Sequence, residues 1–183
     1  MADVIILAGG LSRRVGKNKL VLPYRGKPLL YHVIDTFSPF VDHVIVVTGH
    51  YHQELKEILH ERPFVQIAYN PMYEQGMFTS IQCGAKYVEG DFFIIPGDYP
   101  LIRSETIQAM LEVQAEMLVP RYRGIKGHPL KVMGDLKEEL LSEPSTSNLK
   151  VFRDRHRVEI LDVDDEGILK DIDTCADYQA LPE

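Results

Sequence analysis

The stretch VIILAGGLSRRVGKNKLVLPYRGKPLL, residues 4–30, decides how the rest of the sequence is interpreted. It begins with an unbroken apolar run, Val4–Ala8, which is typical of a strand buried on both faces of a parallel sheet. A Gly-Gly turn follows, and six of the fifteen residues from Arg13 to Lys27 are basic. A buried strand that ends in glycines and cations predicts a turn where backbone N–H groups and basic side chains meet an anion.

The positive charge of this stretch runs against the rest of the chain. Residues 1–34 carry six Lys or Arg and one acid, a balance of +5, within a total of −7 at pH 7. The remaining residues carry fourteen bases and twenty-six acids, a balance of −12. An acidic protein that gathers cations beside a glycine turn is expected to hold a polyanion there, and we expect a nucleoside triphosphate. Nucleic-acid binding is not expected, because the phosphate backbone rewards an extended basic face.

Size and composition favour one globular domain over residues 1–183, with 45% hydrophobic and 26% charged residues. The two cysteines, Cys83 and Cys175, form no CxxC pair, which favours a reduced protein without structural zinc. The apolar run at the N-terminus is too short for a signal peptide or a membrane span. We therefore expect a cytoplasmic protein with no membrane partner.

Short β-branched runs alternate with longer amphipathic stretches. Strands are expected at Val4–Ala8, Val44–Thr48, Val65–Tyr69, Phe92–Pro96, Met117–Pro120 and Val158–Val163. Helices are expected at Pro28–Phe37, His52–Glu61, Gly76–Val88, Ser104–Ala115, Asp135–Ser142 and Thr174–Leu181. The alternation predicts a three-layer α/β/α Rossmann-like fold with a mainly parallel sheet. The segment Glu143–Ser147 is expected to be a mobile loop.

Ligands of such sheets bind beyond the carboxyl ends of the strands, so the residues just after each strand deserve most attention. Six segments occupy these places: GGLSRR (9–14), TGHYH (48–52), NPMYEQG (70–76), GDYP (97–100), RYRGIKGHP (121–129) and DDEGILKDIDT (164–174). Glycines, carboxylates, cations and histidines are concentrated in them. We expect the functional site to be assembled from these segments.

Spacing excludes two familiar phosphate-binding loops. A Walker loop needs four residues between its glycines and then Lys-Ser/Thr, whereas five residues separate Gly10 from Gly16 and Lys17-Asn18 follows. A dinucleotide fingerprint needs GxGxxG, and the run that begins at Gly9 lacks the later glycines. The residues alone leave two interpretations open: an anion-binding loop, or a turn whose basic face is only solvated.

Five motifs in a fixed order span most of the chain, from residue 7 to residue 181. LAGGLSRRVGKNKLVLPYRGKPLL (7–30) is similar to LAAGxSxRMGxxKLLLPxxGxPLL, and NPMYEQGMFTSIQCG (70–84), GDYPLI (97–102), GIKGHPL (124–130) and DIDTCADYQAL (171–181) follow. Together they resemble the motifs of the MobA-like nucleotidyltransferases that complete the molybdenum cofactor. The resemblance implies a fold of the nucleotide-diphospho-sugar transferase type. It also implies Mg²⁺-dependent transfer of a nucleoside monophosphate from a triphosphate to a small phosphorylated acceptor, with release of pyrophosphate.

The resemblance implies roles for individual residues. Asp98 and Asp173 would be the metal ligands, and two carboxylates from separate segments suit Mg²⁺, which takes few protein ligands. Arg14 and Lys19 would grip the triphosphate, so the implied catalytic residues are Arg14, Lys19 and Asp98. The other residues implied to bind the nucleotide are Leu7, Ala8, Gly9 and Gly10, through backbone groups, and Asn70, Gly76 and Ser80, at the nucleoside.

Several of these residues keep a second interpretation. Asp98-Tyr99-Pro100 is also a favourable turn sequence, and Asp171 is an alternative metal ligand to Asp173. Thr174-Cys-Ala-Asp177 fits a helix start in which Thr174 is the cap and Asp177 its partner. The roles of His128, Arg121, Arg123 and Lys126 stay open, since they could meet the phosphate of the acceptor or be structural and solvated.

Two departures from the family pattern bear on substrate choice. Position 9 is glycine where the cytidylyltransferase pattern has alanine, so LAGG is closer to the guanylyltransferase form. The segment LLSEPSTSNLKVF (140–152) replaces a GDxGAR-like turn, and it is open whether residues 143–149 form the acceptor pocket. We predict a molybdopterin cytidylyltransferase-like enzyme that uses CTP. The alternatives are a GTP-dependent guanylyltransferase, a sugar- or alcohol-phosphate nucleotidyltransferase, and a non-catalytic nucleotide-binding protein that helps to mature a client molybdoenzyme.

Overall fold

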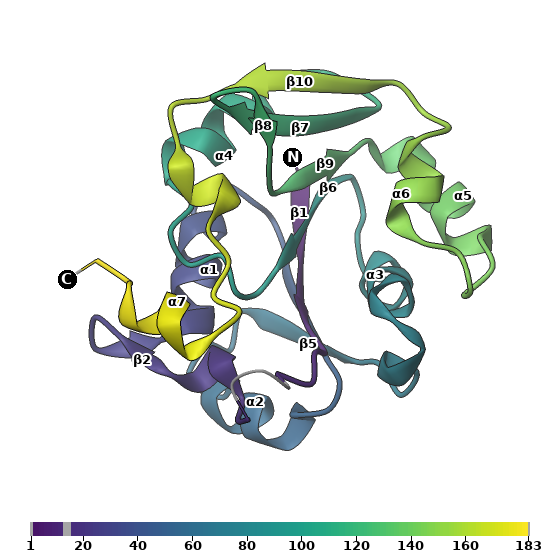
Figure 1. Cartoon of the computed structure of the whole chain (residues 1–183). Helices are drawn as coiled ribbons and strands as arrows, with labels where there is room; N and C mark the ends of the chain where they lie inside the picture. Colours follow the sequence, from purple (N-terminus) through teal and green to yellow (C-terminus); the bar gives the residue numbers. More distant parts are fainter. Residues whose placement is uncertain (1, 13–15, 183) are drawn as a thin grey trace.

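The computed structural model describes residues 2–12 and 16–182, and these ranges form a mixed sheet in the order β10-β7-β9-β6-β1-β4-β5 with β8 paired to β7 (Figure 1). The strands are β1 Ala2–Ala8, β4 Val44–Thr48, β5 Val65–Tyr69, β6 Asp91–Pro96, β7 Met117–Tyr122, β8 Ile125–Lys126, β9 Leu130–Val132 and β10 Val158–Asp162. Strands β6, β1, β4 and β5 are parallel, and β10 is parallel to β7, whereas β9 is antiparallel to both β6 and β7. The predicted mainly parallel sheet is confirmed.

Helices lie on both sides of this sheet. They are α1 Leu29–Phe37, α2 His52–Leu59, α3 Met77–Ala85, α4 Ser104–Leu111, α5 Lys137–Ser142, α6 Leu149–Arg153 and α7 Cys175–Gln179. Short 3-10 turns stand at η1 Lys19–Val21, η2 Tyr73–Gln75, η3 Gly134–Leu136 and η4 Glu166–Leu169, and β2 Pro23–Tyr24 pairs with β3 Lys27–Pro28 in a small hairpin. Figure 1 shows α1 and α4 on one side of the sheet and α3, α5 and α6 on the other.

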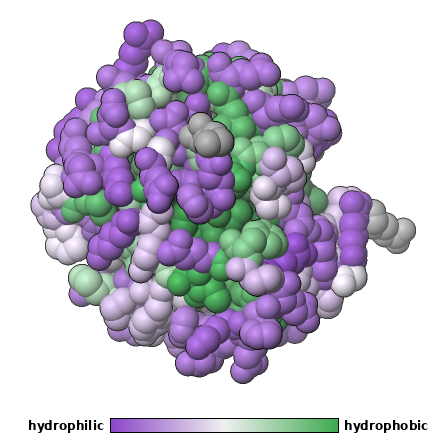
Figure 2. Space-filling model, turned by 180° about the vertical axis from the view of Figure 1, so that it is seen from behind, coloured by the Kyte–Doolittle hydropathy of each residue, from purple (hydrophilic) through white to green (hydrophobic). Residues whose placement is uncertain are grey.

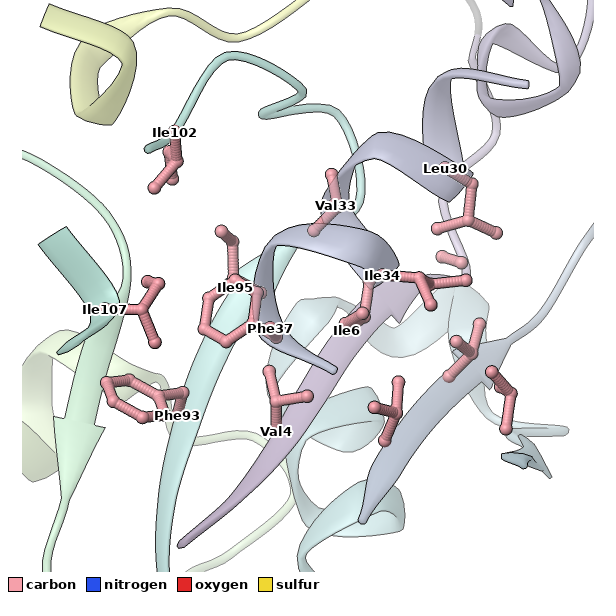
Figure 3. Close-up of a cluster of buried hydrophobic side chains, with 14 of the residues drawn as sticks. Val4, Ile6, Leu30, Val33, Ile34, Phe37, Phe93, Ile95, Ile102 and Ile107 are labelled. Atoms are coloured by element: carbon pink, nitrogen blue, oxygen red, sulfur yellow. The ribbon is translucent and has the colours of Figure 1, made fainter. Parts of the chain in front are cut away.

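Alternate residues of β1 feed two separate hydrophobic clusters, as the two-residue period of a strand requires. Val4 and Ile6 pack against α1, α2 and α4, and Figure 3 shows this cluster around Phe37 and Phe93. Ile5 and Leu7 point the other way and pack against α3, α5 and α6. The three-layer fold thus follows from an apolar strand that is buried on both faces. Its outer surface is mostly hydrophilic, with a hydrophobic band near the middle of the face seen in Figure 2.

Helix α3 approaches β1 so closely that only glycine fits at the contact. A Cβ atom on Gly84 would lie 2.5 Å from Ile5 Cγ2 and 2.9 Å from Val47 Cγ2. We expect Gly84→Ala to lower the free energy of unfolding by about 1–3 kcal/mol, because overpacking outweighs the gain in helix propensity. Urea denaturation measures this, with Cys83→Ala at the neighbouring half-buried position as control. A Gly84→Ala protein as stable as the parent would contradict the proposed packing.

Strand β9 was not predicted, because its three-residue run carries a lysine at its centre. Lys131 is only 3% exposed, yet its ammonium is fully engaged in the interior. Its Nζ donates to the carbonyls of Met110 (3.3 Å), in the last turn of α4, and Val113 (2.8 Å), just beyond α4, and lies 3.7 Å from the Asp91 carboxylate. A buried lysine is tolerated when its charge is paired and hydrogen-bonded, and sequence patterning does not reveal such partners.

Helix α6 was also missed, and it borders the segment predicted to be a loop. Asn148 begins this helix, since its side chain accepts a hydrogen bond from the Val151 amide at 3.0 Å. Before it, the Ser147 amide donates to the Pro144 carbonyl at 2.8 Å, and Gln82 Nε2 donates to the Glu143 carbonyl at 2.8 Å. The segment 143–147 is therefore a turn with side-chain ties to α3, and its mobility stays a prediction.

Among residues 2–12 and 16–182, no helix combines the length and the apolar character needed to cross a bilayer.

Candidate active site

A cavity of about 480 Å³ opens beyond the carboxyl ends of β1 and β6, at the edge of the sheet where the sequence places the site. Its wall contains eight of the residues singled out from the sequence: Leu7, Ala8, Gly9, Gly10, Lys19, Ser80, Asp98 and Asp173. Leu11, Ser12, Leu20, Tyr73, Met77, Pro96 and Gly97 complete it. Arg14, the remaining predicted catalytic residue, lies outside the described residues. Segments separated by more than 150 positions in sequence thus meet in one cavity.

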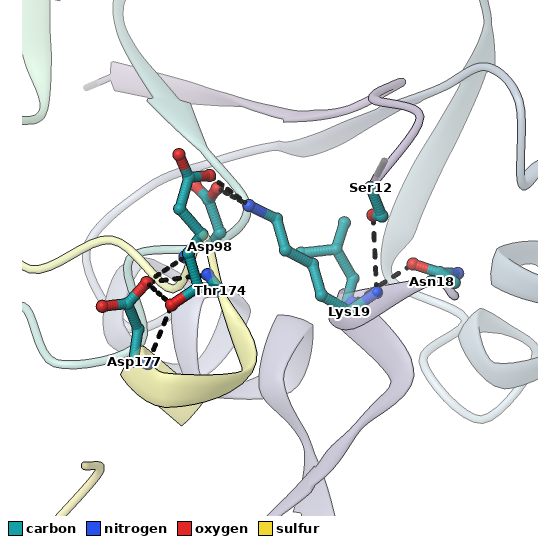
Figure 4. Close-up of polar contacts among 8 residues, drawn as sticks. Ser12, Asn18, Lys19, Asp98, Thr174 and Asp177 are labelled. Atoms are coloured by element: carbon teal, nitrogen blue, oxygen red, sulfur yellow. Dashed lines mark hydrogen bonds and ion pairs between the residues drawn. The ribbon is translucent and has the colours of Figure 1, made fainter. Parts of the chain in front are cut away.

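The chemical centre of the cavity is the Lys19 ammonium, which bridges two carboxylates. Its Nζ lies 2.5 Å from Asp98 Oδ2 and 2.8 Å from Asp173 Oδ1 (Figure 4). The side chains of Lys19 and Asp98 are only 13% and 15% exposed, whereas that of Asp173 is 39% exposed. Burial alone would lower the pKa of Lys19, but the charges and hydrogen bonds of the two carboxylates outweigh it and raise this pKa. Lys19 is therefore a cation at neutral pH.

Asp98 has an oxygen atom to spare. Its Oδ2 accepts the hydrogen bond from Lys19, but its Oδ1 is buried and has no hydrogen-bond partner among the described residues. Burial raises the pKa of this carboxyl group, an effect that Lys19 offsets only partly. An unpartnered buried carboxylate oxygen costs free energy unless a ligand satisfies it. This atom therefore marks the place where the cavity is chemically incomplete.

Two carboxylates that share one cation can also hold a divalent ion. No cluster of three or more His, Cys, Asp or Glu side chains suited to a metal occurs in the described part of the chain. Mg²⁺ commonly takes only one or two carboxylates and completes its shell with water and phosphate oxygens. Asp98 and Asp173 fit this pattern, because Asp98 Oδ1 has no hydrogen-bond partner among the described residues. Both aspartates line the same cavity as the glycine-rich turn.

At Gly9 and Gly10, in the glycine-rich turn after β1, the cavity wall consists of backbone atoms alone, because glycine has no side chain. A Cβ atom on Gly49 would lie only 2.8 Å from the Gly9 carbonyl oxygen, so the turn after β4 supports the turn after β1 directly. A Cβ on Gly9 itself would lie 3.2 Å from Ser80 Oγ, a contact that a shift of a few tenths of an ångström relieves. Position 9 can therefore be glycine or alanine on steric grounds, and steric exclusion does not decide the base.

The residues predicted at the nucleoside separate into two layers. Ser80, on α3, lines the cavity, but Asn70 is only 3% exposed and lies behind it. The Asn70 amide donates to Ser80 Oγ and to Thr79 Oγ1, both at 2.9 Å, and its carbonyl oxygen accepts from the Met72 amide. The side chain of Asn70 is thus used to hold Ser80 in place. Gly76 stands before α3 with φ of +115°, a conformation open mainly to glycine.

Seven wall residues of the cavity were not singled out from the sequence. Two of them, Tyr73 and Met77, lie within the motif that begins at Asn70, but the sequence analysis gave them no role. Met77 is 60% exposed although it is large and hydrophobic, which is the signal that could have indicated a binding surface. Burial is a property of the folded chain, so the sequence carried no such signal.

The two aspartates of the DIDT motif point to different places. Asp173 lines the cavity with Lys19, whereas Asp171 lines a second hollow on the other side of the segment, together with Arg103 and Lys170. The amide of Ile172, which lies between the two aspartates, donates to the Asp98 carbonyl at 3.0 Å and holds this segment against the end of β6. Thr174 and Asp177 form a reciprocal capping box at the start of α7, as predicted. Of the two candidate ligands, Asp173 is the one that faces Lys19.

The other residues with open roles do not line this cavity. Arg121 is engaged with the Asp162 carboxylate through two bonds of 2.6 and 2.7 Å. The Arg123 guanidinium lies 5.0 Å from the centre of the Tyr122 ring, and Lys126 is exposed in β8.

His128 packs against the Tyr99 ring, with 4.7 Å between the ring centres, and burial lowers the pKa of His128. Its Nδ1 atom is buried and has no partner among the described residues. No residue of segment 143–149 lines the cavity either.

The fold has counterparts among solved structures. A nucleotidyl transferase from Methanothermobacter thermautotroptrophicus (Mth528) superposes with a TM-score of 0.83 at 22% identity, over 98% of this chain and 94% of that one. The α/β fold is thus the one found in that nucleotidyl transferase structure. The chain belongs to the family described as the MobA-like NTP transferase domain, which matches residues 4–160. This confirms the family and the fold type that the motifs indicated.

The chain is similar to relatives of two kinds. The chain is 30% identical to the molybdenum cofactor cytidylyltransferase of Escherichia coli (strain K12), over 99% of this chain and 95% of that protein. It is 29% identical to a probable molybdenum cofactor guanylyltransferase of Bacillus cereus (strain ATCC 10987 / NRS 248), over 67% of this chain and 62% of that protein. The chain is therefore a nucleotidyltransferase-family protein similar to both cytidylyl- and guanylyltransferases.

Proposed function

We propose that this protein transfers a nucleoside monophosphate from a nucleoside triphosphate to a small phosphorylated acceptor, with CTP as donor and molybdopterin as acceptor. The observation that carries the proposal is the contact of Lys19 Nζ with both Asp98 and Asp173 beside the glycine-rich turn. One cation and two carboxylates at the wall of a cavity of about 480 Å³ are the groups that a triphosphate and its counter-ion require. A turn whose basic face is only solvated does not require a lysine paired with two carboxylates.

In the proposed reaction, an oxygen of the acceptor phosphate attacks the α-phosphorus. A new P–O bond forms, and the bond from the α-phosphorus to the bridging oxygen breaks, so that pyrophosphate leaves. Lys19, together with Arg14, neutralises phosphate oxygens as charge builds up on the leaving group. The backbone of Gly9 and Gly10 leaves room for the phosphates and the base, while Ser80, held by Asn70, meets the nucleoside.

Asp98 and Asp173 would hold Mg²⁺, which would supply positive charge to the phosphate oxygens and orient them. Asp98 Oδ1 is the protein atom most ready to serve as a ligand, since it is buried and unpartnered. Lys19 must then share these carboxylates with the ion, and its long, flexible stem allows it to turn toward the phosphates. The chain's own charges thus support a site that is complete only with substrate bound.

We propose that the whole chain, residues 1–183, acts as one domain. The family match ends at residue 160, yet Asp173 lies beyond that point and shares Lys19 with Asp98. The Asp98 carbonyl also accepts the hydrogen bond from the Ile172 amide at 3.0 Å. The C-terminal segment is therefore an integral part of the proposed site.

The choice of CTP rests on the cytidylyltransferase relative, which matches the chain over nearly its full length. The GTP-dependent alternative rests on Gly9, since LAGG is closer to the guanylyltransferase pattern. A non-catalytic accessory role has weaker support, because a protein that only binds a nucleotide needs no pair of carboxylates around a lysine. A sugar or alcohol phosphate remains the alternative acceptor.

The test is an assay of pyrophosphate release from CTP, GTP, ATP or UTP, with and without Mg²⁺ and with molybdopterin. We expect release only when Mg²⁺, triphosphate and acceptor are all present, and a complete loss of release after chelation with EDTA. Thermal-shift ranking of the four triphosphates with Mg²⁺ gives the base, because binding to the folded state raises the apparent stability. Tight nucleotide binding without release from any acceptor would support the accessory role instead.

A further inference from the structure

The turn between β4 and α2, together with the first turn of α2, contacts the segment from Gly9 to Asn18 at three points. Neither turn has a role in the proposed reaction. Gly49 packs against the Gly9 carbonyl, as described above. The Tyr51 hydroxyl donates a hydrogen bond to the Leu11 carbonyl at 3.3 Å. Asn18 Nδ2 donates to Glu54 Oε2, in the first turn of α2, at 3.1 Å. Leu11 and Asn18 flank the basic loop, residues 12–17, so described residues on both sides of this loop are anchored to the β4–α2 turn and to α2.

Asn18 connects this anchor to the chemical centre. It is only 3% exposed, and its Oδ1 accepts the hydrogen bond from the Leu20 amide at 3.2 Å, which caps η1. The first residue of η1 is Lys19, whose Nζ reaches Asp98 and Asp173. The two ends of the Asn18 amide thus join Glu54 to the backbone that carries Lys19. A change at Glu54 therefore acts on Lys19 through Asn18 and not by touching the substrate.

We propose that Glu54 and Tyr51 are positioning residues that hold the glycine-rich segment and Lys19 ready for a triphosphate. The proposal rests on the proposed function, and it names the residues that preorganise its phosphate-binding half. Where the backbone at Leu11 and Lys19 is already held in place, it loses less conformational freedom when the ligand arrives, which strengthens binding. Glu54 does not need to approach the phosphates, from which its own charge would be repelled.

Three variants on one helix separate positioning from other roles. Glu54→Ala removes the acceptor of the Asn18 hydrogen bond, whereas Glu54→Gln keeps an amide oxygen that can accept it. Glu57→Ala removes the same charge from an exposed position on the same helix and serves as the matched control. Each variant is titrated calorimetrically with Mg·CTP and Mg·GTP and with the free nucleosides cytidine and guanosine, and its Tm is recorded.

For Glu54→Ala we expect the Kd for the triphosphate to rise about tenfold, the cost of one hydrogen bond to a charged group. The Kd for the nucleoside should stay unchanged, because the nucleoside meets Ser80 and not the basic loop. Glu54→Gln should restore triphosphate binding to about twofold of the parent, since a neutral hydrogen bond is only somewhat weaker than a charged one. Glu57→Ala should bind both ligands like the parent.

An exchange of the two partners provides an independent check. Asn18→Asp alone keeps the cap of η1 but brings two carboxylates together where 3.1 Å now separates Asn18 Nδ2 from Glu54 Oε2. We expect it to weaken triphosphate binding, and the double variant Asn18→Asp/Glu54→Gln to recover it, because glutamine can donate to the new aspartate. Recovery in the double variant measures coupling between the two side chains, which independent structural damage would not produce.

The possible outcomes distinguish this proposal from the proposed function. If the parent protein binds neither triphosphate with Mg²⁺, both are overturned. If the parent binds a triphosphate and Glu54→Ala binds it equally well, the positioning role alone is wrong. A lower Tm with unchanged triphosphate affinity, or an equal loss for triphosphate and nucleoside, would show that Glu54 merely stabilises the fold, and would also overturn the positioning role. Tyr51→Phe should give a smaller effect of the same pattern, since a neutral hydrogen bond is lost.

Discussion

Replacement of Asp98 by asparagine is expected to reduce nucleotidyl transfer by about a thousandfold, the size of effect seen when a charge-stabilising group is removed from an active site. The reason lies in the two oxygens of this side chain. One accepts the hydrogen bond from Lys19 at 2.5 Å, and the other is buried without a partner. An asparagine keeps the shape but offers one oxygen in place of two, and its NH₂ group would face either the Lys19 ammonium or the metal.

Steady-state pyrophosphate release measures this effect, and the fold is checked by the urea midpoint. The control is Asp171→Asn, which changes the first aspartate of the DIDT motif, two residues before Asp173. Asp171 lines a different hollow from Asp173, so its replacement should cost far less activity. If Asp171→Asn were the more damaging variant, the assignment of Asp98 and Asp173 as the metal pair would be wrong. Unchanged activity in Asp98→Asn would remove Asp98 from the mechanism.

Replacement of Lys19 by methionine should weaken triphosphate binding about a hundredfold, as the loss of one partner of a desolvated charge pair does. Methionine retains the length and apolar stem of lysine but carries no charge. Nucleoside binding should be nearly unchanged, because Lys19 bears on the phosphates and Ser80 on the nucleoside. Calorimetric titrations with Mg·CTP and with cytidine measure the two affinities separately. Equal losses for both ligands would place Lys19 away from the triphosphate.

The same variant has a second expected result that concerns the metal. In the parent protein, Lys19 competes with a divalent ion for Asp98 and Asp173. Without the ammonium, the carboxylates are left close together and uncompensated, so the apoprotein should be less stable and should bind Mg²⁺ more tightly. A greater rise of Tm on addition of Mg²⁺ in Lys19→Met than in the parent would show this competition. An equal rise in both proteins would contradict it.

The prediction of the fold from the sequence succeeded where local patterns were strong. The apolar runs at β1, β4 and β6 are long and uninterrupted, so their strands were predicted within two residues at each end. Strand β9 and helix α6 were missed because each is short, and because β9 depends on a buried lysine whose partners come from α4 and β6. Helix ends were predicted up to four residues too long, since periodic patterns continue beyond the last hydrogen-bonded turn.

For the candidate site, the chain's motifs named the residue types but not their mutual contacts. Lys19, Asp98 and Asp173 could be singled out because glycines, cations and carboxylates follow predicted strands. Packing decides that one ammonium contacts both carboxylates. It also decides that Asn70 lies behind Ser80 and that Asp171 and Asp173 line different hollows. Glu54 had no signal, since an exposed glutamate at the start of a helix is common on any protein surface. Tyr51 lies in the segment 48–52 that was expected at the site, but nothing in the sequence assigned it a role.

The sequence by itself determined the class of fold, the family and the edge of the sheet at which the site lies. These depend on local periodicity and on motifs, which are properties of contiguous residues. Only the tertiary structure decided which side chains share the cavity, which atom of Asp98 is left without a partner, and which turn supports the basic loop. The physical reason is that hydrogen bonds and burial depend on distances between residues far apart in the chain, and those distances exist only once the sheet has assembled and its strand ends have been brought together.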